Sequence, residues 1–188
     1  YTDYTISAHE LSEQEGKPDL ENVILRRLEG ESPVFFDVGG FDGQSTIDFI
    51  EKVKNYKKVY FFEPDESMMN KSRNRLSSNR DIEYIQAGVG AIKGLSQFDN
   101  FETGGGCVSA AGRQTIRVVS LDEFITPRLS YIKMDIEGAE MDAICGAEQF
   151  IKEKQPLLSV SVYHRLGDIH RLTKRILKFY PQYHLYIR

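Results

Sequence analysis

Short apolar segments alternate along this chain with segments that carry apolar residues at helical spacing. The apolar segments predict strands at 33–38, 59–62, 82–89, 131–136, 157–163 and 183–187. The segments between them predict helices near 18–28, 47–53, 67–78, 138–151 and 169–177. Strands and helices in this alternation form βαβ units around a mostly parallel sheet with helices on both faces. The sequence therefore predicts one α/β domain over 18–188.

Other stretches do not follow this alternation. Residues 1–17 are polar and lack periodicity, which predicts a loose N-terminal arm. The segment 91–119 combines a triple glycine with short alternating stretches, which predicts an antiparallel insertion or a flexible loop on the substrate side of the domain. Ser120–Glu123 has the form of a capping box and predicts a short helix. The chain stops at Arg188 inside a predicted strand, so we expect a truncated last strand and a piece of a larger protein.

Composition excludes some classes of partner. The chain has 24 basic and 28 acidic residues and a net charge of −4, without the basic footprint of a nucleic-acid or membrane-surface protein. No apolar run approaches the roughly 20 residues that span a bilayer, and we find no signal peptide. The two cysteines have no metal-ligand spacing. We therefore predict a cytoplasmic protein that acts on a small substrate; the sequence does not indicate its oligomeric state.

The turn after the first predicted strand is rich in glycine. It contains Asp37, Gly39, Gly40 and Gly43, and a predicted helix follows. Ligands of open parallel sheets bind outside the carboxyl ends of the strands, where glycine lets the backbone approach a ligand closely. A tight turn without any ligand is the alternative. The order of strand, glycines and helix favours a ligand site.

Acidic and small residues follow the next two predicted strands. Glu63 closes the second strand before Pro64 and Asp65, and Ala87 and Gly88 lie at the end of the third. An acid in the place of Glu63 can accept hydrogen bonds from both hydroxyls of a ribose. The alternative is a charge that only stabilises the next helix N-terminus. Combined with the glycine turn, these residues favour a binding site for a cofactor that contains a ribose.

The spacing of the glycines distinguishes a site for a dinucleotide from a site for S-adenosylmethionine. The dinucleotide fingerprint is G-x-G-x-x-G, whereas here the bulky Phe41 stands where a pyrophosphate would need bare backbone. The negative charge of Asp37 also suits the amino acid group of S-adenosylmethionine better than it suits a pyrophosphate. The sequence therefore favours S-adenosylmethionine, and a nicotinamide-dependent oxidoreductase is the alternative.

The fourth predicted strand carries three charged residues on one side. Lys133, Asp135 and Glu137 alternate there with apolar residues. Burying such charges is costly unless they form pairs or serve a site. The alternative to a catalytic role is a structural ion pair between Lys133 and Asp135 or Glu137. We interpret the three as candidate catalytic residues.

A histidine follows the fifth predicted strand at the same rim. His164 can exchange a proton near neutral pH, which makes it a further candidate catalytic residue. A histidine with only a surface or core role is the alternative. Tyr163 and Arg165 are neighbouring candidates for substrate contact.

With these residues in view, the chain resembles the FkbM-type S-adenosylmethionine-dependent methyltransferases. The resemblance spans about 33–165. Its most specific motif is Lys133-Met134-Asp135-Ile136-Glu137-Gly138-Ala139-Glu140, and it also includes the motifs Phe36–Gly43, Phe62–Asp65 and Val119–Asp122.

The resemblance implies a Rossmann-like class I methyltransferase fold with a seven-stranded sheet, whose last antiparallel strand is not visible in the sequence. It implies O-methylation of a hydroxyl group on a sugar, a glycan or a secondary metabolite. It also supports cofactor contacts by Asp37, Gly39, Gly43 and Glu63, and it places Asp135 and His164 near the reacting centre.

We therefore hypothesise direct transfer of a methyl group to an acceptor oxygen. Asp135 or His164 would be the general base, and Lys133 and Glu137 would orient it. We expect no metal; a divalent ion held by Asp135 and Glu137 is the less favoured alternative. A non-catalytic binding module on the same fold is a further alternative.

Overall fold

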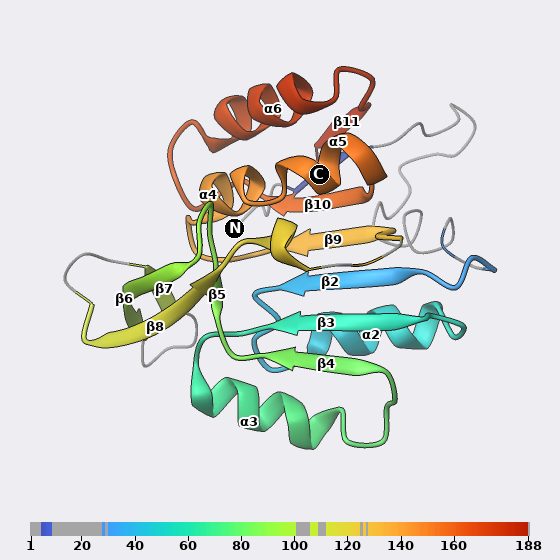
Figure 1. The fold of residues 1–188 in the computed structure, drawn as a ribbon, viewed down its shortest axis with the longest axis vertical. Coiled ribbons are helices and arrows are strands. Elements are labelled where there is room, and N and C mark those ends of the chain that lie inside the picture. Colours follow the sequence, from blue (N-terminus) through green and yellow to red (C-terminus); the bar gives the residue numbers. More distant parts are fainter. Residues whose placement is uncertain are drawn as a thin grey trace.

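A seven-stranded sheet forms the centre of the molecule (Figure 1). This computed structural model describes residues 5–8, 28, 30–100, 106–108, 112–124, 126 and 128–187. The strand order is β11-β1-β10-β9-β2-β3-β4. Its central strands are β2 (Val34–Val38), β3 (Lys58–Phe62), β4 (Ile82–Ile85), β9 (Tyr131–Met134) and β10 (Leu157–Ser161), which all pair in parallel. The predicted α/β fold with a mostly parallel sheet is confirmed.

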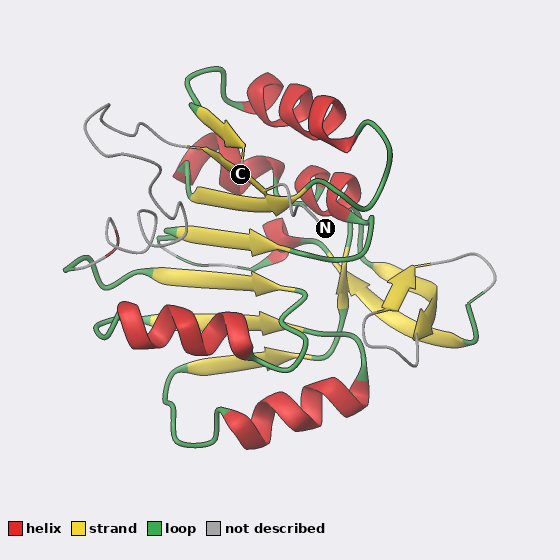
Figure 2. Ribbon diagram, turned by 180° about the vertical axis from the view of Figure 1, so that it is seen from behind, coloured by secondary structure: helices red, strands yellow, loops and turns green. Residues whose placement is uncertain are grey.

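Helices cover both faces of this sheet, because successive residues of the buried strands point to opposite sides. Phe36 of β2 belongs to the cluster packed under three helices: α4 (Glu140–Cys145), α5 (Glu148–Lys154) and α6 (Asp168–Phe179). The adjacent Phe35 packs against α2 (Gln44–Lys52) on the other face. Phe61 of β3 packs there against α3 (Glu66–Arg75). Figure 2 shows α2 in front of the sheet from this second side.

The helix predicted over 138–151 is divided into α4 and α5 at Gly146. A Cβ on Gly146 would lie 2.1 Å from the carbonyl oxygen of Gly90, so the chain passes too close there for a side chain. Asp122 caps the new helix by accepting hydrogen bonds from the backbone N–H groups of Gln149 and Phe150, at 2.9 and 3.0 Å. The break depends on contacts that are distant in sequence.

An N-terminal strand completes the sheet. β1 (Thr5–Ala8) lies between β10 and β11 (Leu185–Ile187) and is antiparallel to both. The prediction of a loose arm over 1–17 is wrong for these four residues, because their order depends on backbone pairing with strands more than a hundred residues away. The antiparallel strand that the family resemblance implies is thus supplied by the start of the chain. Most of the helix predicted near 18–28 lies outside the described residues.

A second sheet stands beside the carboxyl ends of the central strands (Figure 1). Its order is β5 (Gly88–Val89), β8 (Gln114–Val119), β6 (Gly94–Asn100) and β7 (Gly106–Val108). The strand predicted over 82–89 is divided between β4 and β5, and the antiparallel form of the 91–119 insertion is confirmed by the pairing of β6 with β7 and β8.

A short 3-10 helix, η1 (Leu121–Glu123), follows at the predicted place. Its Ser120 does not cap it: the hydroxyl donates instead to the carbonyl of Gly146, at 2.8 Å. None of the helices among the described residues is long and apolar enough to cross a membrane.

Candidate active site

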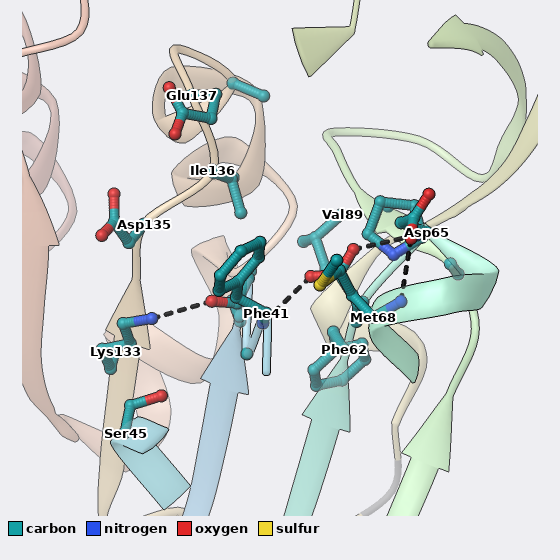
Figure 3. A pocket seen from close by; sticks show the side chains of 18 of the residues that line it. Phe41, Ser45, Phe62, Asp65, Met68, Val89, Lys133, Asp135, Ile136 and Glu137 are labelled. Atoms are coloured by element: carbon teal, nitrogen blue, oxygen red, sulfur yellow. Dashed lines mark hydrogen bonds between the residues drawn. The ribbon is translucent and has the colours of Figure 1, made fainter. Parts of the chain in front are cut away.

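A cavity of about 500 Å³ opens at the carboxyl ends of β2, β3 and β9. Most of the residues predicted for the site line it: Gly39, Gly40, Phe41, Glu63, Pro64, Asp65, Ala87, Gly88, Lys133, Asp135 and Glu137. Asp37, Gly43 and His164 do not line it. In the view of Figure 3, Lys133, Asp135 and Glu137 lie to one side of Phe41, and Asp65 and Met68 lie to the other.

Two glycines of the turn are required by packing as well as by access to the cavity. Gly39 has a φ of 77°, and a Cβ on it would lie 2.0 Å from the carbonyl oxygen of Asp135. A Cβ on Gly40 would lie 2.1 Å from the ring of Phe61. The backbone N–H groups of both glycines donate to the carbonyl of Phe62, at 3.0 Å each. The turn is therefore held close to β3 and to the end of β9, with its outer surface facing the cavity.

Asp37 has a different position from the one that the sequence suggests. Its carboxylate is fully buried, and one oxygen accepts hydrogen bonds from the hydroxyls of Ser45 and Thr46, at 2.6 and 2.7 Å. The other oxygen lies 3.4 Å from the amine of Lys133, because the register of β2 and β9 sets the two residues opposite each other. Asp37 thus lies beneath the cavity and does not line it. From there it holds the first turn of α2 and the amine of Lys133.

Lys133 connects this buried carboxylate to the glycine turn. Its amine donates to the carbonyl oxygen of Gly39, at 2.8 Å (Figure 3). The ion pair that sequence reasoning offered as an alternative, between Lys133 and Asp135 or Glu137, is wrong. Lys133 pairs with Asp37 across the strands, and the two acids lie beyond the end of β9 against His164.

Glu63 is oriented by the backbone at the end of β3. One carboxylate oxygen accepts from the N–H of Phe41, at 3.0 Å, and the other from the N–H of Asp65, at 2.8 Å. Each oxygen can accept a further hydrogen bond, so the group keeps capacity for two hydroxyl donors. Asp65 is the residue that caps α3, by accepting from the N–H of Met68 at 2.8 Å, so Glu63 does not serve as the helix cap.

Burial raises the pKa of Glu63 to about 7, and its two backbone hydrogen bonds and Lys133 only partly oppose this effect. The carboxyl is therefore balanced between its neutral and ionised forms near neutral pH. Pairing it with hydroxyl donors favours the ionised form.

Among the charged residues that line the cavity, acidic ones are in excess. Six lining residues are acidic and one is a lysine: Asp42, Asp48, Glu63, Asp65, Asp135 and Glu137 against Lys133. Such a wall attracts a cation and repels a pyrophosphate. This arrangement favours a sulfonium ligand over a dinucleotide.

His164 lies just behind this wall, among three carboxylates. Its Nε2 is 3.4 Å from Oδ1 of Asp135 and 3.3 Å from Oε2 of Glu137, and its Nδ1 is 2.9 Å from Oε1 of Glu140. Burial of the imidazole disfavours its charged form, but the three carboxylates, Glu140 foremost, outweigh this and raise the pKa of His164. The hydroxyl of Tyr163 donates to the same Oδ1 of Asp135, at 3.1 Å.

Glu140 was not predicted as a site residue. Its side chain is fully buried in the first turn of α4, and Oε1 accepts from the N–H of Ile136 at 3.0 Å. Burial raises the pKa of Glu140, but the contact with His164 and the backbone hydrogen bonds outweigh this and lower it. Its position in the Lys133–Glu140 motif was the available signal.

Other lining residues were also missed by sequence reasoning. Phe98 of β6 and Ile116 of β8 reach the cavity from the second sheet, and Ser45 reaches it from the first turn of α2. Ser45 follows a glycine turn at a predicted helix start, which is a usable signal. No local pattern indicates Phe98 or Ile116, because their approach depends on how the second sheet is placed.

A family model describes most of the chain. The methyltransferase FkbM domain matches residues 37–186. No curated protein matches the chain.

Solved structures show the same fold, and one of them is an FkbM methyltransferase. Methyltransferase FkbM from Methylobacillus flagellatus KT is 29% identical with a TM-score of 0.67; the match covers 80% of this chain but only 38% of that protein. Precorrin-6y C5,15-methyltransferase from Geobacter metallireducens GS-15 is 14% identical with a TM-score of 0.53, covering 91% of this chain and 76% of that one. The protein SMU.1697c from Streptococcus mutans, solved in complex with SAH, is 16% identical with a TM-score of 0.52, covering 90% and 84%.

Proposed function

Because the chain belongs to the FkbM methyltransferase family, we propose that it transfers a methyl group from S-adenosylmethionine to a hydroxyl oxygen of a sugar, a glycan or a secondary metabolite. The observation that carries this proposal is the acidic cavity at the ends of β2, β3 and β9, with Glu63 oriented at its edge. A dinucleotide would bring its pyrophosphate against the same carboxylates, so we do not favour a nicotinamide-dependent reaction.

The cavity supports particular contacts with the cofactor. Glu63 keeps a free acceptor site on each oxygen for the two ribose hydroxyls. The outer surface of Gly39, Gly40 and Phe41 would accommodate the amino acid group, and Lys133 and Ser45, which also line the cavity, would bind its carboxylate. Asp37 acts as a positioning residue in this proposal, because it holds both Lys133 and Ser45.

The main task of the protein would be alignment. S-adenosylmethionine supplies a methyl group that is already activated on a sulfonium. Holding two reactants in line can contribute roughly 7–11 kcal/mol to catalysis. The acceptor would enter between the glycine turn and the side chains of Asp135 and Glu137, which line the cavity.

Asp135 is our choice for the group that accepts the proton of the hydroxyl. It lines the cavity and is 36% exposed, whereas His164 lies behind it and holds a proton more strongly than usual. His164 and Tyr163 would hold Asp135 through their contacts with its Oδ1. His164 is thus a positioning residue in this proposal.

Calorimetry with S-adenosylhomocysteine tests the cofactor site. We expect binding by the wild type and a loss of about 100-fold or more in affinity in Glu63→Ala. The reason is that two hydrogen bonds to a charged acceptor contribute about 1.5–3 kcal/mol each. Glu63→Gln keeps the shape of the side chain and should also weaken binding.

The matched control is Glu66→Ala, which removes an exposed carboxylate three positions away and should bind like the wild type. An intact full-length protein that fails to bind S-adenosylhomocysteine would rule out the proposed function. Saturable binding of NADH in its place would support the oxidoreductase.

The raised pKa of Glu63 makes a second measurement informative. Since hydroxyl donors favour the ionised carboxylate, affinity for S-adenosylhomocysteine should rise with pH until about pH 7 and then level off. Below that value we expect a decrease of about tenfold per pH unit. Calorimetry from pH 5.5 to 8.5 measures this, and Glu63→Gln should remove the pH dependence. An equally steep profile in Glu63→Gln would assign it to another group.

A further inference from the structure

A cluster of three carboxylates and one imidazole lies at the end of the cavity, and the proposed proton transfer to Asp135 leaves most of it unexplained. It consists of Asp135, Glu137, Glu140 and His164. The side chain of His164 is 8% exposed, and its Nε2 has no aligned hydrogen bond with the described residues. Oε2 of Glu140 is equally buried and has no hydrogen-bond partner among the described residues. Buried polar atoms of this kind require a partner.

We propose that this cluster binds a divalent metal ion, with Asp135 and His164 as ligands. Metal–oxygen and metal–nitrogen bonds of about 2.0–2.2 Å place neighbouring ligand atoms about 3.0–3.5 Å apart. Nε2 of His164 lies 3.4 Å from the nearer oxygen of Asp135 and 3.3 Å from that of Glu137. Single donor atoms of Asp135, Glu140 and His164 all lie within 4.8 Å of one another.

Glu140 has the position of an orienting residue behind a metal ligand. Metal-binding histidines commonly donate their second ring N–H to a carboxylate, which fixes the tautomer and the direction of the ring. Oε1 of Glu140 lies 2.9 Å from Nδ1 and is itself held by the N–H of Ile136. Nε2 consequently faces Asp135 and Glu137, the two acids that line the cavity.

Charge also favours a cation. Three carboxylates outnumber the one imidazole in this cluster, so even a protonated His164 leaves an excess of negative charge at a partly buried place, and a cation would balance it. The donor set of oxygen and imidazole nitrogen suits borderline divalent ions such as Mn²⁺, Fe²⁺ or Zn²⁺. A structural role alone would leave Nε2 between two carboxylates without an aligned bond to either one.

The ion would have a chemical use at this place, although that use depends on the proposed function. A carboxylate by itself is a weak base for an alcohol. A divalent ion beside Asp135 would bind the acceptor oxygen and lower the pKa of its hydroxyl, which makes loss of the proton easier. Binding of the metal does not itself depend on methyl transfer.

Titration with Mn²⁺ alone, followed by electron paramagnetic resonance, tests the site. We expect one bound ion per chain, a loss of about 100-fold or more in affinity in Asp135→Asn and His164→Ala, and about 10–100-fold in Glu140→Gln. Asp142→Asn, an exposed acid on the same helix as Glu140, should keep the wild-type affinity. Competition by Zn²⁺ repeats the test with a second ion.

Circular dichroism and S-adenosylhomocysteine binding on each variant separate loss of the ion from loss of the fold. A wild type that binds S-adenosylhomocysteine but neither ion at millimolar concentration overturns the metal site alone. The same is true if Asp135→Asn binds Mn²⁺ like the wild type. A protein that binds Mn²⁺ through these residues but not S-adenosylhomocysteine keeps the metal site and overturns the proposed function.

Discussion

Replacing Asp135 with asparagine is expected to lower turnover by about 10²–10⁴-fold, the usual contribution of a general base. Asparagine has nearly the same shape and still accepts a hydrogen bond from Tyr163, but it cannot take a proton from the acceptor. Affinity for S-adenosylhomocysteine should change little, because the proposed ribose contacts lie at Glu63, directly after β3, and β2 separates β3 from β9.

Once an acceptor has been identified, single-turnover methyl transfer from labelled S-adenosylmethionine measures the chemical step directly. Asp142→Asn makes the same chemical change at an exposed position of α4 and should turn over like the wild type. If Asp135→Asn retains more than a tenth of the wild-type rate, Asp135 is not the base, and a residue supplied by the acceptor or by the rest of the protein must take its place.

Gly39→Ala is expected to destabilise the fold by about 2–5 kcal/mol. An alanine at this position would adopt a left-handed conformation, which costs roughly 1–2 kcal/mol, and would overpack its surroundings, which costs about 1–3 kcal/mol more. The new methyl group would meet the carbonyl oxygen of Asp135 at 2.0 Å and the side chain of Ile136 at 2.8 Å. Neither can retreat easily, because both follow directly from β9 in the centre of the sheet.

Urea denaturation followed by circular dichroism gives the change in the free energy of unfolding. Gly94→Ala is the matched control, since a Cβ there meets nothing within 4 Å and its φ lies outside the left-handed region. We expect less than about 1 kcal/mol for that variant. Equal midpoints for the two variants would show that the turn can move away from β9, contrary to the packing described above.

These two expectations concern one junction. The carbonyl of Asp135 is the atom that excludes a side chain at Gly39, and Lys133, two residues earlier, donates to the carbonyl of Gly39. The turn proposed to hold the cofactor and the residue proposed to accept the proton are therefore positioned by the same contacts. A change that loosens this junction should reduce both cofactor affinity and turnover.

The sequence by itself determined the central strands, most of the helices beside them and the strand ends where the candidate site lies. These features depend on local periodicity and on the residues that close each strand, so Asp37–Gly43, Glu63–Asp65 and Lys133–Glu137 could be located without a structure. The antiparallel character of the 91–119 insertion was also within reach, because alternating polar and apolar residues are a local pattern.

Only the tertiary structure decided which of these residues meet. Asp37 faces Lys133 because two parallel strands share a register, and β1 is ordered because it pairs with β10 and β11 across the length of the chain. His164 faces Glu140 because α4 begins beside the end of β10, after the chain turns through positive φ at Glu137 and Gly138. The direction of a side chain beyond a strand end depends on such backbone angles and on distant packing, and local sequence encodes neither.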